Sequence, residues 1–462
     1  MESIFARQRE AFAKHPMPSV EDRKQQLAAL KSLLIAHKDA IAAAINADFT
    51  AHSVDETLMA EIMPSVHHID YSLKRLRRWM KPGCRSVALH FLPASARVVY
   101  QPLGVVGIIV PFNYPVNLAM VPLVAALAAG NRVMIKISEH TPRTAVLISE
   151  MLCKGFADDH VAVVTGEADI AAAFARLPFD HLLFTGSTPI GKLVMSAAAE
   201  NLTPVTLELG GKSPAIIAGD IPLEDIIDRI CFAKSLNGGQ TCVAPDYVLI
   251  PRGKLEAFIL LYKATFKKMF PTINGNADYT SIINARTHQQ LQDWLQDAAD
   301  KGARIEKASD ETMDDGTFRM PLHLVTQVTD EMTIMQKELF GPILPVVPYD
   351  NIEEALAYVN RRPRPLALYL FTYDRVLQEH VTTHTHSGSM CINEALIQVG
   401  VEDLPFGGIG HSGMGHYHGH EGFLTMSKSK SVMSKGRLNS MRLMYPPYGG
   451  AIQKWLMKWL VR

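Results

Sequence analysis

The chain has 462 residues, which is long for a single hydrophobic core and predicts two or three domains. Lysine plus arginine and aspartate plus glutamate each total 46, so the overall charge gives no indication of a nucleic-acid partner. The five cysteines are odd in number and lack the spacing of a metal site or of disulfide pairs. We therefore expect a cytoplasmic protein with free thiols.

The N-terminus lacks the apolar core of a signal peptide. Residues 103–129 are strongly apolar, but prolines and asparagines interrupt them. A membrane span needs about 20 mostly uninterrupted apolar residues. We interpret this stretch as a buried strand, a turn and a helix, and we expect a soluble protein.

The first elements predicted along the chain are helical. Residues 20–48 have apolar side chains at helical spacing, and Ser19 with Asp22 forms a capping-box pattern before them. A second helix is predicted over 55–80, where the basic end suits the negative pole of the helix dipole. Residues 86–102 are predicted to form two strands around a turn, outside the elements that follow.

Short apolar runs then alternate with helical stretches, first up to residue 209 and again from about 214 to 393. This rhythm predicts two successive α/β domains with parallel sheets, the first of which binds a nucleotide at the carboxyl ends of its strands. The glycine-rich residues 405–415 are predicted to be a loop. The predicted strands are 104–110, 132–137, 161–165, 180–185, 203–209, 214–218, 246–250, 343–348, 366–372 and 388–393.

Three residues could perform chemistry, although each alone has a structural alternative. Cys242 follows a glycine-rich segment and is either a nucleophile or a small core residue. Glu208 stands in an otherwise apolar strand, which suits a general base with a raised pKa as well as a satisfied buried glutamate. Asn113 follows an apolar strand and could donate to an oxyanion or cap a helix.

Two further pairs are candidates for binding a nucleotide. Gly186 and Ser187 lie between a predicted strand and a helix, where backbone amides can receive a pyrophosphate. An ordinary strand-to-helix turn would explain this pair equally well. Lys136 and Glu139 come at the end of another strand, where they could bind ribose hydroxyls or simply be solvated.

A thiol, a carboxylate, an amide donor and a nucleotide-binding strand edge are what the oxidation of an aldehyde through a thioester requires. With these groups in place, the chain resembles the aldehyde dehydrogenase family over nearly its whole length. The resemblance rests on seven motifs in the family's order and approximate spacing, namely PFNYP, KISE, FTGSTPIG, LELGGKSP, NGGQTC, ELFGPILPV and PFGGIGHSGMG.

The resemblance implies that Cys242 attacks the aldehyde as a thiolate, with the oxyanion held by the Asn113 side chain and by the backbone N–H of Cys242. Glu208 then activates the water that hydrolyses the thioester. Members that pass the acyl group to coenzyme A typically lack this base, so Glu208 favours a hydrolytic dehydrogenase. The family needs no metal, and we interpret the histidines of HYHGHE at 416–421 as packing residues.

The resemblance also implies NAD as the cofactor, with NADP as an alternative. An acidic residue at position 139 disfavours a 2′-phosphate. Lys136 and Glu139 match the family's contacts to the adenosine ribose, and Gly186 and Ser187 match its pyrophosphate turn. The other implied cofactor contacts are Gly191, Leu209, Glu338 and Phe340, of which the last two match contacts to the nicotinamide ribose.

The implied fold class is α/β, an aldehyde dehydrogenase fold with two doubly wound parallel-sheet domains and a small β-hairpin oligomerisation arm. Residues 1–84 with 103–209 would form the dinucleotide-binding domain, and 210–410 the catalytic domain. Residues 85–102 with about 425–445 would form the arm, and 411–462 a C-terminal tail.

Two features indicate a branch of the family: only 112 residues precede Asn113, and GHYHGHEGFLTMSKSKSVM with MYPPYGG follows the glycine-rich loop. They resemble the branch that holds the class 3, fatty aldehyde and bacterial coniferyl aldehyde dehydrogenases, most closely the last. This implies a homodimer that oxidises an apolar, aromatic aldehyde of the coniferyl type. The alternatives are a medium- or long-chain fatty aldehyde dehydrogenase and a non-catalytic NAD-binding protein of the same fold.

The last residues, AIQKWLMKWLVR, place apolar and basic side chains on different faces of a predicted helix. Such a helix lies at a membrane surface, here the inner one, or packs on the protein or on a partner subunit, and the sequence leaves both open. The apolar face holds Ile452, Trp455, Leu456, Trp459 and Leu460, and the basic face holds Lys454, Lys458 and Arg462.

Overall fold

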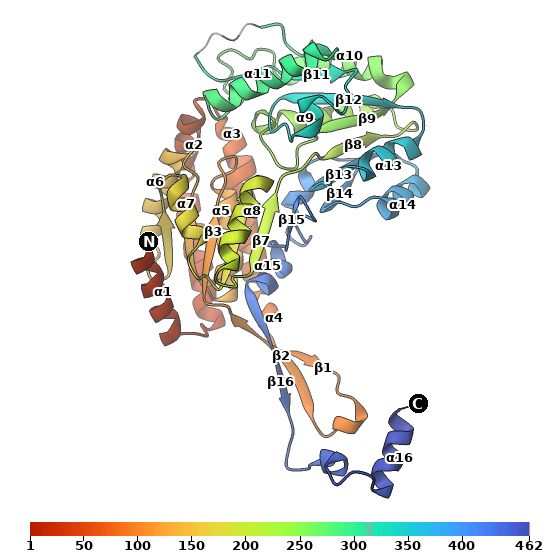
Figure 1. Cartoon of the computed structure of the whole chain (residues 1–462). Coiled ribbons are helices and arrows are strands. Elements are labelled where there is room, and N and C mark those ends of the chain that lie inside the picture. The colour runs from red at the N-terminus through yellow and green to blue at the C-terminus, as the bar shows by residue number, and fades with distance from the viewer. Residues whose placement is uncertain (312, 314–315, 462) are drawn as a thin grey trace.

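The computed structural model describes residues 1–311, 313 and 316–461, and it contains two α/β lobes and a slender arm (Figure 1). Arg462, which the sequence assigns to the basic face of the last helix, lies outside the described residues. The arm projects from the lobe that carries the N-terminus and ends near the C-terminal helix.

Helices begin the chain. The capping box is confirmed, because the Ser19 hydroxyl accepts from the Asp22 amide at 3.1 Å and the Asp22 carboxylate accepts from the Ser19 amide at 2.9 Å. The predicted helix over 55–80 is also confirmed, but it contains one π-helical turn. The helices are α1 (Glu2–Lys14), α2 (Val20–Phe49), α3 (Val54–Thr57), the π-turn η1 (Leu58–Ile62) and α4 (Met63–Trp79).

The first lobe is built on a six-stranded sheet in the order β15-β7-β6-β3-β4-β5. All neighbours are parallel except β15 with β7, and the five predicted strands of this sheet are confirmed. The parallel strands are β3 (Val105–Ile109), β4 (Arg132–Lys136), β5 (Val161–Val164), β6 (His181–Gly186) and β7 (Val205–Leu209). The helices are α5 (Asn117–Ala129), α6 (Pro142–Cys153), α7 (Ala168–Ala175) and α8 (Thr188–Ala199).

The glycine-rich segment 405–415 is not entirely a loop, as the sequence predicted. Two of its residues form the edge strand β15 (Gly413–Met414), which pairs Gly413 with Glu208. Gly413 has a φ of +134°, and a Cβ there would collide with the carbonyl oxygen of Leu207. Glycine therefore lets a segment that looks like a loop approach β7 closely enough to pair with it.

The second lobe has a seven-stranded sheet in the order β10-β11-β12-β9-β8-β13-β14. The five predicted strands are confirmed, whereas β10 and β11 were missed. β10 is a partly exposed edge strand with three charged residues, so it lacks the apolar run by which the other strands were predicted. The strands are β8 (Pro214–Ile217), β9 (Tyr247–Pro251), β10 (Arg304–Lys307), β11 (His323–Thr326), β12 (Ile343–Tyr349), β13 (Ala367–Phe371) and β14 (Ser389–Ile392). The helices are α9 (Ile227–Ser235), α10 (Leu255–Met269), α11 (Ala285–Asp300), α12 (Thr333–Gln336), α13 (Ile352–Asn360) and α14 (Arg375–His384).

The arm is a three-stranded antiparallel sheet in the order β1-β2-β16, made of β1 (Gly83–Arg85), β2 (Ser95–Pro102) and β16 (Ser427–Ser434). The prediction that its first strand follows residue 86 is wrong. β1 comes before that point, and residues 89–91 form a short 3-10 helix. Both edges of β2 are occupied, one by β1 and the other by β16, so residues 86–94 serve as the connection.

Residues after 411 do not form one separate tail. β15 joins the first sheet and β16 joins the arm, while α15 (Gly419–Thr425) packs on the first lobe, where Phe423 is fully buried. By contrast, the short 3-10 helix Ser440–Met444 and α16 (Ala451–Leu460) have no buried residue among those that the structure describes. Within the described part of the chain, no helix is both long and apolar enough to cross a membrane.

Candidate functional site

The three residues proposed for the chemistry come from both lobes. Glu208 lies on β7, Asn113 follows β3, and Cys242 follows the short turn η4 (Leu236–Gly239), which leads toward β9. Asn113 and Glu208 are each 3% exposed, and Cys242 is partly buried. Burial, together with the charges of Glu338 and Glu208, raises the pKa of the Cys242 thiol to about 12. Both carboxylates therefore lie close to the thiol, and the free protein favours the neutral thiol.

The turn before Cys242 winds through left-handed backbone. Asn237, Gly238 and Gly239 have φ values of +53°, +59° and +78°. A Cβ on Gly239 would meet the carbonyl oxygen of Gly341 at 2.5 Å, so glycine is required there. A left-handed asparagine is uncommon, and such strain concentrates at functional sites.

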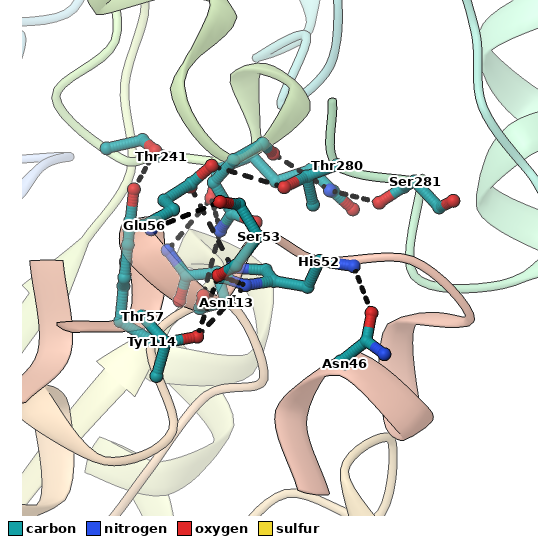
Figure 2. A network of polar contacts seen from close by, with 12 residues as sticks. Asn46, His52, Ser53, Glu56, Thr57, Asn113, Tyr114, Thr241, Thr280 and Ser281 are labelled. Atoms are coloured by element: carbon teal, nitrogen blue, oxygen red, sulfur yellow. Dashed lines mark hydrogen bonds and ion pairs between the residues drawn. The ribbon is translucent and has the colours of Figure 1, made fainter. Parts of the chain in front are cut away.

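Hydrogen bonds tie this nucleophile turn to the loop that carries Asn113. The Asn237 side chain donates to the Asn113 carbonyl at 2.8 Å, and the Asn113 side chain donates to the Gln240 carbonyl at 3.1 Å. The hydroxyls of Tyr114 and Thr241 lie 2.7 Å apart. Figure 2 shows Asn113 and Tyr114 within this buried polar network. An amide has two N–H donors, so one N–H of Asn113 can hold the side chain in place while the other donates to an oxyanion.

Of the two interpretations that the sequence left open for Glu208, the satisfied buried glutamate does not fit the structure. Among the described residues, neither of its carboxylate oxygens has a hydrogen-bond partner of good geometry. Burial holds its pKa well above the usual value, and the Gly408 amide offsets this only in part. A buried carboxyl of this kind favours its protonated form, and it is a strong base once deprotonated.

Glu338 is a second buried carboxyl close to the Cys242 thiol. Burial and the charge of Asp246 raise its pKa to about 8, against the opposing effects of the Gly211 amide and the Lys212 and Lys234 cations. The carboxylate packs so closely on Gly210 that a Cβ there would collide with it. The sequence assigned Glu338 only to a ribose contact and missed its proximity to the thiol.

The residues predicted to bind the adenosine end lie together at the end of β4, where Lys136 is the last residue of the strand and Glu139 follows it. The Lys136 ammonium donates to the Ile137 carbonyl at 2.7 Å and lies 3.8 Å from the Glu139 carboxylate. Lys136 is 1% exposed, so its position is set by packing. The Lys136 ammonium and the Glu139 carboxylate are thus held next to each other.

The residues predicted to receive the pyrophosphate lie between β6 and α8. Gly186 ends β6, and Ser187 is the N-cap of α8 without a side-chain cap bond. A Cβ on Gly191 would meet the Leu209 side chain at 2.6 Å, so Gly191 allows α8 to pack on β7. The Thr185 hydroxyl at this edge is buried and has no partner among the described residues. The free amides of the helix N-terminus and this unpartnered hydroxyl fit a dinucleotide phosphate.

The order of strands spaces these groups along one edge of the sheet. From β4 the edge passes β3 and β6 to β7, which is three strand steps or about 14 Å. Lys136 and Glu139 are thus not brought to Glu208 but lie three strands away from it along the same edge. Phe340 has a φ of +44°, and its ring packs edge-on against Phe112, 5.7 Å between centroids, beside the Asn113 loop.

The sequence model described as "Aldehyde dehydrogenase family" matches residues 1–432. The chain belongs to the aldehyde dehydrogenase family. It is an oxidoreductase that acts on aldehydes, with the NAD(P)-dependent thioester chemistry of this family.

Similar proteins cover the chain almost completely. The sequence is 57% identical over 462 residues to a "Probable coniferyl aldehyde dehydrogenase" of Pseudomonas aeruginosa, covering 100% of this chain and 96% of that one. It is 42% identical to a "Coniferyl aldehyde dehydrogenase" of a Pseudomonas species, covering 97% and 94%. It is also 37% identical to "Aldehyde dehydrogenase family 3 member A2" of Mus musculus, covering 100% and 94%.

Solved structures agree with this. A substrate-bound AldH of Staphylococcus aureus superposes with a TM-score of 0.93 at 35% identity and covers 99% of both chains. A Mycobacterium tuberculosis aldehyde dehydrogenase complexed with NAD+ has a TM-score of 0.84 at 28% identity, covering 94% of this chain and 90% of that one. The predicted aldehyde dehydrogenase fold is therefore confirmed.

Sequence reasoning on this aldehyde dehydrogenase missed the buried residues that hold the site together. Gln240 bonds the carbonyls of Asn237 and Ser281 and accepts from the Ile283 amide at 2.9 Å. Glu56, which Figure 2 shows in the polar network, is also buried, as is Glu61, which accepts from the amides of Val116 and Asn117. The only signal for them was two acidic residues in the mostly apolar stretch ETLMAEIMP.

From the sequence, the histidines of HYHGHE at 416–421 were interpreted as packing residues. His418 stacks on Phe406 with 4.9 Å between ring centroids, and its ring lies 5.4 Å from that of His68. Burial holds the pKa of His418 well below its usual value, so the ring is neutral. The described residues contain no group of three histidine, cysteine or acidic side chains that could hold a metal ion.

Proposed function

We propose that this aldehyde dehydrogenase oxidises an apolar aromatic aldehyde of the coniferyl type to its carboxylic acid, with NAD as the preferred cofactor. The convergence of Cys242, Asn113 and Glu208 carries the reaction. The substrate class rests on the 57% identity to the Pseudomonas aeruginosa relative across the whole chain.

In the proposed reaction the Cys242 thiolate attacks the aldehyde carbon and forms a thiohemiacetal. The Asn113 amide and the backbone N–H of Cys242 donate to the oxygen that becomes negative. NAD, when bound, supplies the hydride acceptor, and loss of hydride from the thiohemiacetal leaves a thioester on Cys242. Glu208 takes a proton from water, which attacks the thioester and releases the acid and the thiolate. Overall, aldehyde, NAD+ and water give acid, NADH and a proton.

The cofactor would lie along the edge of the first sheet. Lys136 and Glu139 would hold the adenosine ribose, and Gly186 with Ser187 would receive the pyrophosphate. A carboxylate at position 139 repels a 2′-phosphate, which supports NAD over NADP. The remaining contacts assigned to the cofactor are Gly191, Leu209, Glu338 and Phe340.

We assign a separate role to each of the three sheets. The six-stranded lobe would bind the dinucleotide, the seven-stranded lobe would supply the nucleophile, and the arm would join two copies into a homodimer. We assign the protein to the cytoplasm, with contact to the inner membrane surface through α16. This helix is the basis of the second candidate function, oxidation of medium- or long-chain fatty aldehydes, because its exposed apolar residues suit a lipid surface.

Purified protein can be assayed with coniferyl aldehyde, benzaldehyde and decanal, each with NAD and with NADP. We expect the fastest reduction of cofactor with NAD and the aromatic aldehydes. The measurement is the absorbance of the reduced cofactor. Cys242→Ala should abolish turnover and keep cofactor binding, while Cys391→Ala, at a partly buried cysteine of β14, should remain active. Oxidation of decanal alone would move the assignment to the fatty aldehyde candidate, and turnover by Cys242→Ala would refute the nucleophile.

Glu208→Gln should slow hydrolysis of the thioester more than hydride transfer, because the amide cannot take a proton from water. Stopped-flow absorbance should therefore show a burst of reduced cofactor close to one per active site, followed by a stall. A steady rate equal to that of the wild type would remove Glu208 from the role of base.

Asn113→Ala should raise the barrier by about 3 kcal/mol, the usual effect of losing one oxyanion donor. The check is kcat for an aromatic aldehyde, with the dissociation constant of NAD measured in parallel as the control for folding. A loss of less than about tenfold in kcat would count against the oxyanion role.

Removal of residues 451–462 tests the role of α16. In the described structure Ile452, Trp455 and Trp459 are 60%, 66% and 49% exposed. The full chain should float with vesicles that contain anionic lipid, and the truncated chain should not. If the full chain stays in solution, the membrane contact is refuted, and sedimentation of both chains then reports whether α16 instead joins two copies of the 51.0 kDa chain.

A further inference from the structure

The π-turn η1 interrupts the helical run between Val54 and Trp79. A π-turn bonds residues five apart, so it brings Glu56, just before the turn, and Glu61, within it, toward one face. Both side chains are buried, and the charge of Glu56 raises the pKa of Glu61, which places the two carboxyls near each other. π-turns are rare and frequently mark functional sites, yet neither acid takes part in the proposed reaction.

Glu61 caps the helix that follows Asn113. One carboxylate oxygen accepts from the amides of Val116 and Asn117 at 2.9 and 2.6 Å, at the N-terminus of α5. The N-cap residue of α5, Val116, makes no side-chain cap bond of its own. Burial raises the pKa of Glu61 to about 8, and these two amides oppose the shift. An acidic side chain from another helix thus supplies the cap that the local sequence lacks.

Two further hydrogen bonds through Ser65, one helical turn after Glu61, also attach the start of α5 to this helical run. The Asn117 side chain donates to the Ser65 hydroxyl at 3.1 Å, and that hydroxyl donates to the Glu61 carbonyl at 2.6 Å. The start of α5 is therefore held by the π-turn through both a side chain and the main chain. Asn113 lies four residues before the start of α5, so its position depends on where α5 begins.

Glu56, from the same helical run, contacts the residues that support the turn before Cys242. Its carboxylate accepts from the Thr280 hydroxyl at 3.2 Å, and a backbone bond from Asn237 lowers its pKa against the effect of burial. The next residue, Ser281, accepts from the Gln240 side chain at 3.0 Å. Figure 2 shows Glu56 among Thr241, Thr280 and Asn113. The short segment from Glu56 to Glu61 thus contacts both the start of α5, which follows the Asn113 loop, and the segment that supports Cys242.

We propose that Glu61 is a positioning residue for the oxyanion hole: by capping α5 from the π-turn, it sets the place of the Asn113 amide relative to Cys242. The inference rests on the proposed oxyanion role of Asn113. Glu61 acts through Asn113 and touches neither substrate nor cofactor. Its removal should therefore affect the chemical step and leave cofactor binding intact.

Glu61→Ala should lower kcat for an aromatic aldehyde on the order of tenfold to a hundredfold, because small displacements of catalytic groups have effects of this size. The dissociation constant of NAD should not change. Glu61→Gln, whose amide oxygen can still accept from both amides, should restore most of the rate. Asp180→Ala is the matched control: Asp180 accepts from the Val105 amide at 2.7 Å, at the opposite end of β3 from Asn113, so its loss should leave kcat unchanged.

A double-mutant cycle with Asn113→Ala provides the decisive readout. If Glu61 acts through Asn113, Glu61→Ala should add no further loss of kcat in the Asn113→Ala background. Equal losses in both backgrounds, or wild-type kcat in Glu61→Ala, would overturn the inference and leave the proposed function standing. No effect of Asn113→Ala itself would overturn the oxyanion assignment and the inference together. If Glu61→Ala does not fold, Glu61→Asp enters the same cycle, because its shorter side chain withdraws the carboxylate from α5.

Discussion

The candidate site depends on the hydrogen-bonded junction between the nucleophile turn and the Asn113 loop. The two segments belong to different lobes, and side-chain bonds between Asn237, Gln240 and Asn113 join them. Because these groups are buried, each bond forms away from competing water and a missing partner would be costly. The junction fixes the distance between a thiol and an amide donor that lie more than a hundred residues apart in the chain.

Around this junction the protein buries acidic groups without counter-charges that neutralise them fully. Burial raises the pKa of Glu56, Glu61 and Glu338 to about 8, and it raises that of Glu208 well above its usual value. Each of these groups destabilises the fold unless it is protonated or hydrogen-bonded. Glu56 and Glu61 have hydrogen-bond donors from the protein, whereas Glu208 has none of good geometry within the described residues. This contrast separates acids that support the site from one that is free to exchange a proton.

The C-terminal part of the chain completes elements that begin much earlier. β15 covers the edge of β7 beside Glu208, and β16 pairs with β2 over eight residue pairs in the arm. The arm strands are attached to the first lobe through α15, where Phe423 packs on Trp79 with 5.7 Å between ring centroids. The segment that forms the edge strand of the six-stranded sheet is therefore continuous with the segment that builds the arm.

The sequence by itself determined most strands and helices and the three reactive residues. Hydrophobic periodicity and capping are local, so β3 to β9 and α2 could be predicted from a few neighbouring residues. The motifs around Cys242, Glu208 and Asn113 are also short, and they carried the resemblance to the aldehyde dehydrogenase family.

Only the tertiary structure decided how these pieces meet. The pairing of Gly413 with Glu208, the three-stranded arm and the contacts of Glu61 with α5 join residues that are distant along the chain. Such contacts leave no periodic pattern in the sequence, because only one residue on each side takes part. The raised pKa values of the buried acids likewise follow from burial by the whole fold, which no short stretch of sequence specifies.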